Sequence, residues 1–241
     1  MMSASRGHDL VMMRLLELGA DVFTRNTKDR DALYMAVLYA HQSGGLLYIL
    51  QALTFRGVDF NQIDSNGSTP LHECASRNLA RPIQYLVEAG ADVNLRHMRT
   101  GLTPLQMACS AIDNPDVETI VTLLDKGAHP NWKDTSGKSA FDTVLISHSA
   151  RMNREKAMAT RAANHRMDQS TIDEVSSFVE HALPVLMALV KHGARYTEQS
   201  LLLIRPSFRV MYFFVCMYVC MYVCMYVCMF VCMRVCMFVG L

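Results

Sequence analysis

The chain has 241 residues, with 23 Lys or Arg against 22 Asp or Glu, so its formal net charge is only +1. A chain of this length can bury a core of its own, and its balanced charge gives no general attraction to nucleic acid or anionic lipid. Of the eight cysteines only Cys74 and Cys109 precede residue 200, which fits a reducing compartment. Charges recur at short intervals from Met1 to Asp21, so no secretory signal is expected there.

Short segments that begin with glycine follow apolar runs at five places. These segments are Gly19-Ala20-Asp21-Val22, Gly57-Val58-Asp59-Phe60, Gly90-Ala91-Asp92-Val93, Gly127-Ala128-His129-Pro130 and Gly193-Ala194-Arg195-Tyr196. Their glycines are 38, 33, 37 and 66 residues apart, and the last step is two periods of 33. The preceding runs, such as 82–90 and 118–127, have apolar residues at i, i+3 and i+4. This pattern predicts amphipathic helices that end at glycines such as Gly90 and Gly127.

A second pattern opens another helix in four of the units. Its copies are Asp31-Ala32-Leu33-Tyr34, Thr69-Pro70-Leu71-His72, Thr103-Pro104-Leu105-Gln106 and Ser139-Ala140-Phe141-Asp142. Thr69 and Thr103 are suited to cap a helix, and Pro70 and Pro104 then fall at its first position, where a missing N–H is harmless. Leu33, Leu71, Leu105 and Phe141 are expected to point into the core.

The two interleaved patterns resemble the ankyrin repeat, in which TPLH opens the first helix and GADVN follows the second. The resemblance covers about residues 4–196 at the period of roughly 33 residues typical of that family. It implies an all-α fold: an ankyrin-repeat solenoid of helix-turn-helix units joined by short β-hairpins. It also implies that His72 ties neighbouring turns together and is neither catalytic nor a metal ligand. We expect residues 1–204 to form one domain of about five repeats.

Three units depart from the family pattern. The first matches only from the end of its first helix, so we expect the chain to be a fragment or the half-repeat to be poorly ordered. The second keeps Leu33 but replaces Thr-Pro by Asp31-Ala32, as in a degenerate repeat. The last is split: its first helix is predicted at about Ala140–Ser147 and its second at Leu183–Gly193, around an insertion at 148–181. This basic insertion is interpreted either as a docking segment or as a solvated excursion without a partner.

The tail, residues 205–241, has low complexity. From Met217 it repeats Met-Tyr-Val-Cys, and cysteines at strict i, i+4 spacing in an apolar run do not match the paired spacing of metal sites. Residues 210–233 contain 24 positions without a charge, enough for a transmembrane helix. Repetition of TATG gives the same four amino acids in every forward frame, with no stop codon. We therefore predict a microsatellite-encoded tail arising by read-through, with a membrane anchor as the alternative if the tail is genuine. The genomic sequence beneath Met217–Leu241 should be a near-perfect TATG array.

No glycine-rich phosphate loop, HExxH motif or nucleophile elbow is present in the sequence. We expect no enzyme activity, cofactor or metal, and Cys74 and Cys109 fall at small helix-packing positions. The resemblance implies a cytoplasmic protein–protein scaffold that binds a partner on its concave surface, with the nucleus left open. Alternatives are a tail-anchored membrane adaptor and a ubiquitin-ligase substrate receptor without its recruiting box. No nucleic-acid partner is expected, because the basic insertion lacks interleaved aromatic residues.

The family's usual contact positions can be transferred to this chain residue by residue. On the first helices they are Met35, Leu38, Tyr39, Glu73, Ser76, Arg77, Met107, Ser110, Ala111, Thr143 and Ile146. At the hairpin tips they are Lys28, Asp64, Ser65, His97, Met98, Arg99, Lys133 and Asp134. Leu38 and Tyr39 are interpreted either as a binding hot spot or as packing against the first repeat. Arg77 and the group His97–Arg99 are expected to share one region and to favour an acidic or mixed protein segment, or else to be ordinary solvated side chains.

Overall fold

A computed structural model describes residues 9–39, 46–111, 115–162 and 181–195, with the backbone alone for residues 9 and 152–162. The regular structure of these residues is helical. The helices are α2 (Asp9–Glu17), α3 (Ala32–Tyr39), α4 (Leu46–Phe55), α5 (Pro70–Ser76), α6 (Ala80–Glu88), α7 (Pro104–Cys109), α8 (Val117–Asp125), α9 (Ala140–Ala162) and α11 (Leu183–Lys191).

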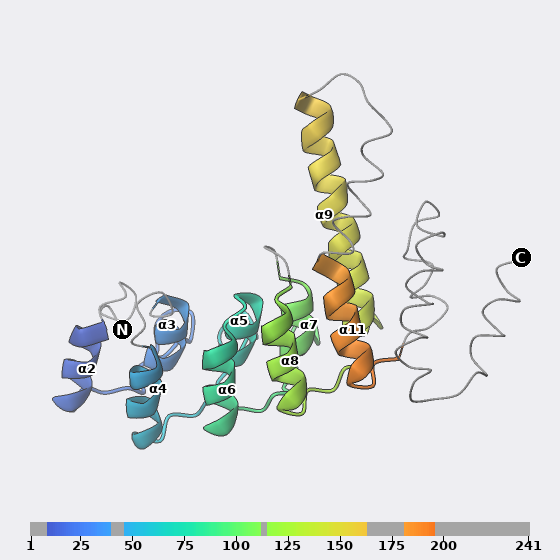
Figure 1. Cartoon of the computed structure of the whole chain (residues 1–241). Coiled ribbons are helices and arrows are strands. Elements are labelled where there is room, and N and C mark those ends of the chain that lie inside the picture. The colour runs from blue at the N-terminus through green and yellow to red at the C-terminus, as the bar shows by residue number, and fades with distance from the viewer. Residues whose placement is uncertain (1–8, 40–45, 112–114, 163–180, 196–241) are drawn as a thin grey trace, which may run out of the picture.

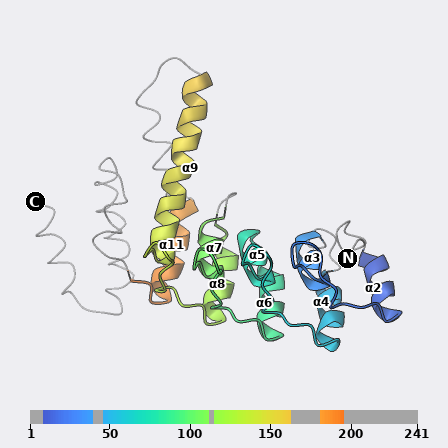
Figure 2. The same ribbon diagram turned by 180° about the vertical axis from the view of Figure 1, so that it is seen from behind.

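The helices stand in two parallel rows, which Figure 1 and Figure 2 show from opposite sides. One row consists of the first helices of the units, α3, α5, α7 and α9, and the other of α2, α4, α6, α8 and α11. Each helix contacts its neighbours in the row and its partner across the rows; α5, for example, contacts α3, α7 and α6. This sequential stack of helix pairs confirms the predicted all-α solenoid.

Side-chain caps fix where the first helices begin. The hydroxyl of Thr69 accepts the backbone N–H of His72, and the hydroxyl of Thr103 accepts that of Gln106, with a proline in the first turn of each helix. In the second unit Asp31 replaces the threonine, and its carboxylate accepts the N–H of Tyr34 at 2.8 Å. The Asp-Ala opening of this unit therefore retains a helix cap.

Glycines in the left-handed region fix where the second helices end. Gly90 has φ +107° and Gly127 has φ +91°, values that side chains with a Cβ seldom adopt. The residue after each glycine then donates its N–H to a carbonyl in the last turn, as Ala91 does to Leu86 at 2.9 Å and Ala128 to Leu123 at 2.9 Å. These bonds satisfy carbonyls that the end of a helix leaves without partners.

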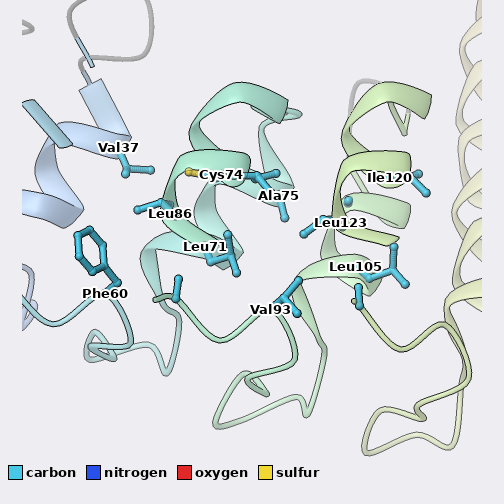
Figure 3. Close-up of a cluster of buried hydrophobic side chains, with 14 of the residues drawn as sticks. Val37, Phe60, Leu71, Cys74, Ala75, Leu86, Val93, Leu105, Ile120 and Leu123 are labelled. Atoms are coloured by element: carbon cyan, nitrogen blue, oxygen red, sulfur yellow. The ribbon is translucent and has the colours of Figure 1, made fainter. Parts of the chain in front are cut away.

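The core runs the length of the stack between the two rows. Leu71 and Leu105 on the first helices and Leu86 and Leu123 on the second are at most 1% exposed, and Figure 3 shows them pointing into the spaces between helices. The small side chain of Cys74 fills one such space, and burial raises the pKa of its thiol. A neutral, buried thiol of this kind packs as a small apolar side chain.

The first helix of the last unit is longer than predicted. It was expected to end near Ser147, but α9 continues to Ala162 and extends beyond the other first helices (Figure 1). The reason lies in residues 148–162, which contain no glycine or proline and are rich in Ala, Met, Arg, Lys and Glu, all good helix formers. The first part of the insertion is therefore helical, while residues 163–180 lie outside the described part.

The low-complexity tail, residues 205–241, lies outside the described residues, and so does the possible membrane helix at 210–233. Among the helices that are described, none combines the length and the apolar character needed to span a bilayer.

Candidate protein-binding face

The hairpin loops between units are shaped by one acceptor side chain each. The carboxylate of Asp64 accepts the N–H groups of Asn66 and Ser68 at 2.9 and 3.0 Å. Asp134 repeats the arrangement in a later hairpin, and Asn26 does so in an earlier one. At the equivalent place His97 uses its Nδ1 to accept the N–H of Arg99 at 3.3 Å. The hairpins of Asn26, Asp64 and Asp134 therefore form the same tight turn, whereas the His97 hairpin is one residue longer, since the N–H of His97 donates to the carbonyl of Leu102.

Backbone hydrogen bonds hold successive hairpins in a row. Ser65 donates to the carbonyl of Lys28 at 3.0 Å, Met98 to that of Gly67 at 2.9 Å, and Thr135 to that of Thr100 at 3.1 Å. Gly67 is needed for this approach, because a Cβ there would lie 2.7 Å from the Cβ of Met98. The tips are thus fixed relative to one another before any partner binds.

His72 links the start of α5 to the next hairpin. Its Nε2 donates to the carbonyl of Leu102 at 3.0 Å, and its Nδ1 accepts the N–H of Thr69 at 3.3 Å. A carbonyl can only accept and an N–H can only donate, so these partners require the neutral tautomer with the proton on Nε2. Burial lowers the pKa of His72 to about 4, and the nearby ring of His97 adds to the effect.

Gln106 performs the same task one repeat later. Its amide oxygen accepts the N–H of Thr103 at 2.9 Å, and its amide nitrogen donates to the carbonyls of Trp132 and Lys138 at 3.0 and 2.8 Å. A glutamine thus supplies the same acceptor and donor pair as the neutral imidazole, without a group that titrates.

A ladder of three asparagines joins the units at the base of the hairpins. The side-chain amide of each asparagine donates to the carbonyl of the glycine in the next unit, and its oxygen accepts the N–H of the residue two positions after that glycine. The three sets are Asn61 with Gly90 and Asp92, Asn94 with Gly127 and His129, and Asn131 with Gly193 and Arg195. The two repeated sequence patterns did not predict this role. A signal was present, however, because an asparagine stands four residues after each of Gly57, Gly90 and Gly127.

The last rung of the ladder shows that the split unit is closed. The amide of Asn131 donates to the carbonyl of Gly193 at 2.8 Å, across 62 residues of chain. At the C-terminal end of α8, Nε2 of His192 lies 3.1 Å from the carboxylate of Asp125. The helix α11 therefore occupies the place of a second helix beside α8, as the late period in the sequence predicted.

Asp64 was predicted as an exposed tip residue, but its side chain is buried. It forms an ion pair with the guanidinium of Arg30, whose Nη2 lies 2.8 Å from its Oδ2, and that guanidinium in turn lies over the ring of Tyr34. Burial alone would raise the pKa of Asp64, but hydrogen bonds from the Ser68 N–H and from Arg30 outweigh it and the pKa is lowered. Asp64 therefore acts within the fold, joining two hairpins.

The predicted contact residues of the second unit are also mostly buried. Met35 is buried on α3, and Leu38 is only 5% exposed, whereas Tyr39 is 45% exposed. The side chain of Leu38 is therefore a core residue, which favours the packing interpretation for it. Tyr39 alone of this pair presents a large surface to solvent.

Arg77 and Arg99 lie at different places and both make contacts within the fold. The guanidinium of Arg77, at the end of α5, donates to Glu73 at 2.6 Å and to the carbonyl of Leu38 at 2.8 Å. Arg99 donates to the carbonyl of Ser65 at 2.7 Å, and its neighbour His97 packs edge-on against His72 in the first turn of α5. Arg77 and the group His97–Arg99 thus lie near opposite ends of α5, roughly 10 Å apart along its axis. Within the group His97–Arg99, the side chain of Met98 is 75% exposed at the hairpin tip.

Some of the remaining predicted residues line one groove. A cavity of about 710 Å³ opens between the end of α7 and the side of α9. Its lining includes Ser110, Ala111, Lys138, Thr143, Ile146 and Arg151. The groove forms because the short helix α7 is followed by the small residues Ser110 and Ala111. The helix α9, in contrast, continues beyond the end of α7 (Figure 2). Four predicted positions, Ser110, Ala111, Thr143 and Ile146, meet here, and Asp134 lies at the edge.

The groove combines apolar surface with positive charge. Ile146 is 38% exposed, and Leu102, Ala111 and Val144 contribute further apolar atoms. Burial lowers the pKa of His148 to about 4, so this imidazole is neutral at physiological pH. Lys138 and Arg151 are the cations of the lining, and Oδ1 of the acid Asp134 accepts two N–H groups of its own turn. No group of three or more metal-ligating side chains occurs within the ranges that the structure describes.

Comparison with known proteins agrees with this architecture. Residues 38–134 match the family of ankyrin repeats in three copies. A segment of 141 residues is 30% identical to Tyrosine-protein kinase Shark of Drosophila melanogaster and covers 58% of this chain but 14% of the kinase. A segment of 84 residues is 38% identical to an ankyrin and IPT/TIG repeat-containing protein of Schizosaccharomyces pombe, covering 35% and 7% of the two chains. A third, of 135 residues, is 29% identical to B-cell lymphoma 3 protein homolog of Mus musculus, covering 55% and 29%.

The chain thus spans less than a third of the length of each of these relatives. What it shares with them is the repeat unit, and ankyrin repeats serve as protein–protein interaction modules. The family match agrees with three features of the structure: helices that end at glycines, helices that begin with capped Thr-Pro pairs, and hairpins that are linked to one another. The chain is therefore an ankyrin repeat-containing protein.

Proposed function

We propose that the chain is a non-enzymatic scaffold that binds a segment of a partner protein in the groove between α7 and α9. The observation that carries this proposal is the groove itself, about 710 Å³ in volume and lined by first-helix and hairpin residues. A volume of this size accommodates several side chains of a bound segment. The helices on both sides are held by caps and by the Gln106 bridge, so the site is organised before binding.

The hairpin tips form a second part of the proposed face. Met98 and the exposed residues Ser65, Arg99 and Lys133 follow one another along the row of tips. A partner that filled the groove and reached over the row would contact several units at once. Glu73, Ser76 and Met107 are half-buried on α5 and α7 and would lie beneath it.

Two variants that add the same bulk at different places test the proposal. Ser110→Trp fills the groove beside α7, whereas Gln84→Trp adds an indole to the exposed side of α6. Both variants and the unchanged chain are used as baits in quantitative pull-downs from the same extract, after thermal melts show that all three unfold cooperatively. We expect a set of proteins that Ser110→Trp loses and Gln84→Trp retains. Identical sets for the three baits would contradict the groove as the binding site.

A further inference from the structure

The two cations of the groove are placed where α9 leaves the stack. Lys138 lies in the hairpin before α9, and Arg151 lies on α9 itself, on the groove side. The backbone of Lys138 is engaged, since its N–H donates to Asp134 at 2.8 Å and its carbonyl accepts from Gln106 at 2.8 Å. Its ammonium makes no ion pair with any residue that the structure describes. The side chain is thus available to a ligand, while the backbone holds its position.

The sequence of α9 beyond Arg151 is basic: it contains Arg154, Lys156 and Arg161, with Glu155 as the single acid before Ala162. The other first helices, as far as the structure describes them, end at Tyr39, Ser76 and Cys109, whereas α9 continues to Ala162.

We infer that the groove takes an acidic protein segment with apolar residues. This inference rests on the proposed function and names the chemistry of its partner. The apolar residues fit against Ile146, Leu102 and Ala111, and the acidic residues pair with Lys138 and Arg151. Charge complementarity of this kind speeds association and selects the partner, and it weakens as salt is added.

Nucleic acid fits the same charge less well. Single-stranded nucleic acid binds where aromatic side chains stack on its bases, and the groove lining contains no Phe, Tyr or Trp. Phosphate binding also relies on many cations, whereas the groove holds two beside the acid Asp134. The apolar surface of Ile146 makes no favourable contact with a charged phosphate chain, whereas a leucine or valine side chain can pack against it.

Three 12-residue peptides of matched length test the charge. They repeat Glu-Glu-Leu, Gln-Gln-Leu or Lys-Lys-Leu, carry a fluorophore, and are titrated with the full chain while anisotropy is measured at two salt concentrations. We expect the Glu peptide to bind, with affinity falling as salt rises, and to exceed the Gln peptide by about tenfold. Equal binding of the Glu and Gln peptides would overturn the inference but leave the groove intact as a protein site, which the pull-down judges separately.

Charge variants locate the contact. Lys138→Glu should lower the affinity for the Glu peptide by about tenfold, because it replaces a positive charge with a negative one. Lys138→Gln should lower the affinity less, because it only removes the positive charge. The matched control is Arg81→Glu, which reverses an exposed charge on α6 and should change affinity less than about twofold. Equal effects of Lys138→Glu and Arg81→Glu, or preferential binding of a single-stranded RNA oligonucleotide, would each overturn the inference.

Discussion

At the residue scale, one position in the opening motif of each unit carries a hydrogen-bonding task that different side chains fulfil. His72 and Gln106 both accept the N–H of the capping threonine and donate to a carbonyl of the next hairpin. The resemblance predicted that His72 would tie neighbouring turns. It did not predict that the bond would require a neutral imidazole, because the tautomer depends on partners 3 and 30 residues away.

His72 should make the stability of the protein depend on pH. Its folded-state pKa of about 4 lies below the ordinary 6.5. Between pH 6.5 and 4, therefore, the imidazole is protonated in the unfolded chain but neutral in the folded chain. The stability that the neutral ring provides is complete above about pH 6.5 and is lost between 6.5 and 4. The loss attributable to this group is on the order of 3 kcal/mol, taking about 1.4 kcal/mol per pKa unit.

The variant His72→Gln removes this titration while keeping the hydrogen bonds that Gln106 shows to be feasible. Urea denaturation at pH 7 should give nearly the same free energy of unfolding for both proteins. Between pH 6.5 and 4 the original chain should lose more stability than the variant, with the difference growing as pH falls. Parallel curves for the two proteins would show that His72 does not contribute and would leave His148, whose pKa is also lowered to about 4 by burial, as the group to test.

The asparagine ladder leads to a second prediction at this scale. Asn94→Ala removes two hydrogen bonds, at 3.0 and 2.9 Å, that join two repeats, and should lower the free energy of unfolding by about 1–2 kcal/mol. The control is Gln84→Ala, which removes only a bond to Glu88 on the same helix and should cost less than about 0.5 kcal/mol. Chemical denaturation of the three proteins gives the comparison. If the Asn94→Ala protein were as stable as the control, water would be replacing the two hydrogen bonds of Asn94 without loss of free energy.

At the scale of elements, the pattern of apolar residues, glycines and Thr-Pro pairs was sufficient to place the helices of the third and fourth units. The information is local: a cap, a proline and a C-terminal glycine each act within one turn. The end of α9 was predicted wrongly because the family pattern sets a length that the local residues do not enforce. Nothing between Ser147 and Ala162 stops a helix, so it continues.

Buried leucines of the first helices should dominate the stability of their units. Leu71→Ala or Leu105→Ala removes most of a side chain that is at most 1% exposed, and should lower the free energy of unfolding by about 2–5 kcal/mol. Met98→Ala truncates a side chain that is 75% exposed and should change it by less than about 0.5 kcal/mol. Equal effects at the core and tip positions in denaturant titrations would contradict the assigned packing.

The candidate face was less predictable than the helices. Residue-by-residue transfer found five residues that line the groove, but it also selected Met35, Leu38 and Asp64, which are buried. Exposure depends on what the neighbouring units place over a position, and the repeat pattern does not record this. Arg77 and Arg99 were likewise selected for their charge, whereas their guanidinium groups bond to carbonyls of the preceding unit.

At the scale of the whole molecule, each unit contacts mainly its neighbours, and stability is close to a sum of unit and interface terms. A chain ending at Ile204 should therefore keep its repeats folded, because it retains every described element. Far-UV circular dichroism should report the same helical signal per described residue, and the melting temperature should match that of the full chain. A shorter chain that melted much earlier would show that residues 205–241 contribute to the stack.

The closure of the last unit by Asn131 and His192 has a consequence for how this protein can be cut and rejoined. Among the described residues, the contacts that hold α11 in place lie on α8, α9 and the Asn131 loop. Two separately produced pieces, 1–162 and 181–241, should therefore complement each other, as the halves of a split protein do. For the same reason, we expect that exchanging or lengthening residues 163–180, or fusing a reporter there, leaves the spacing of the described helices unchanged.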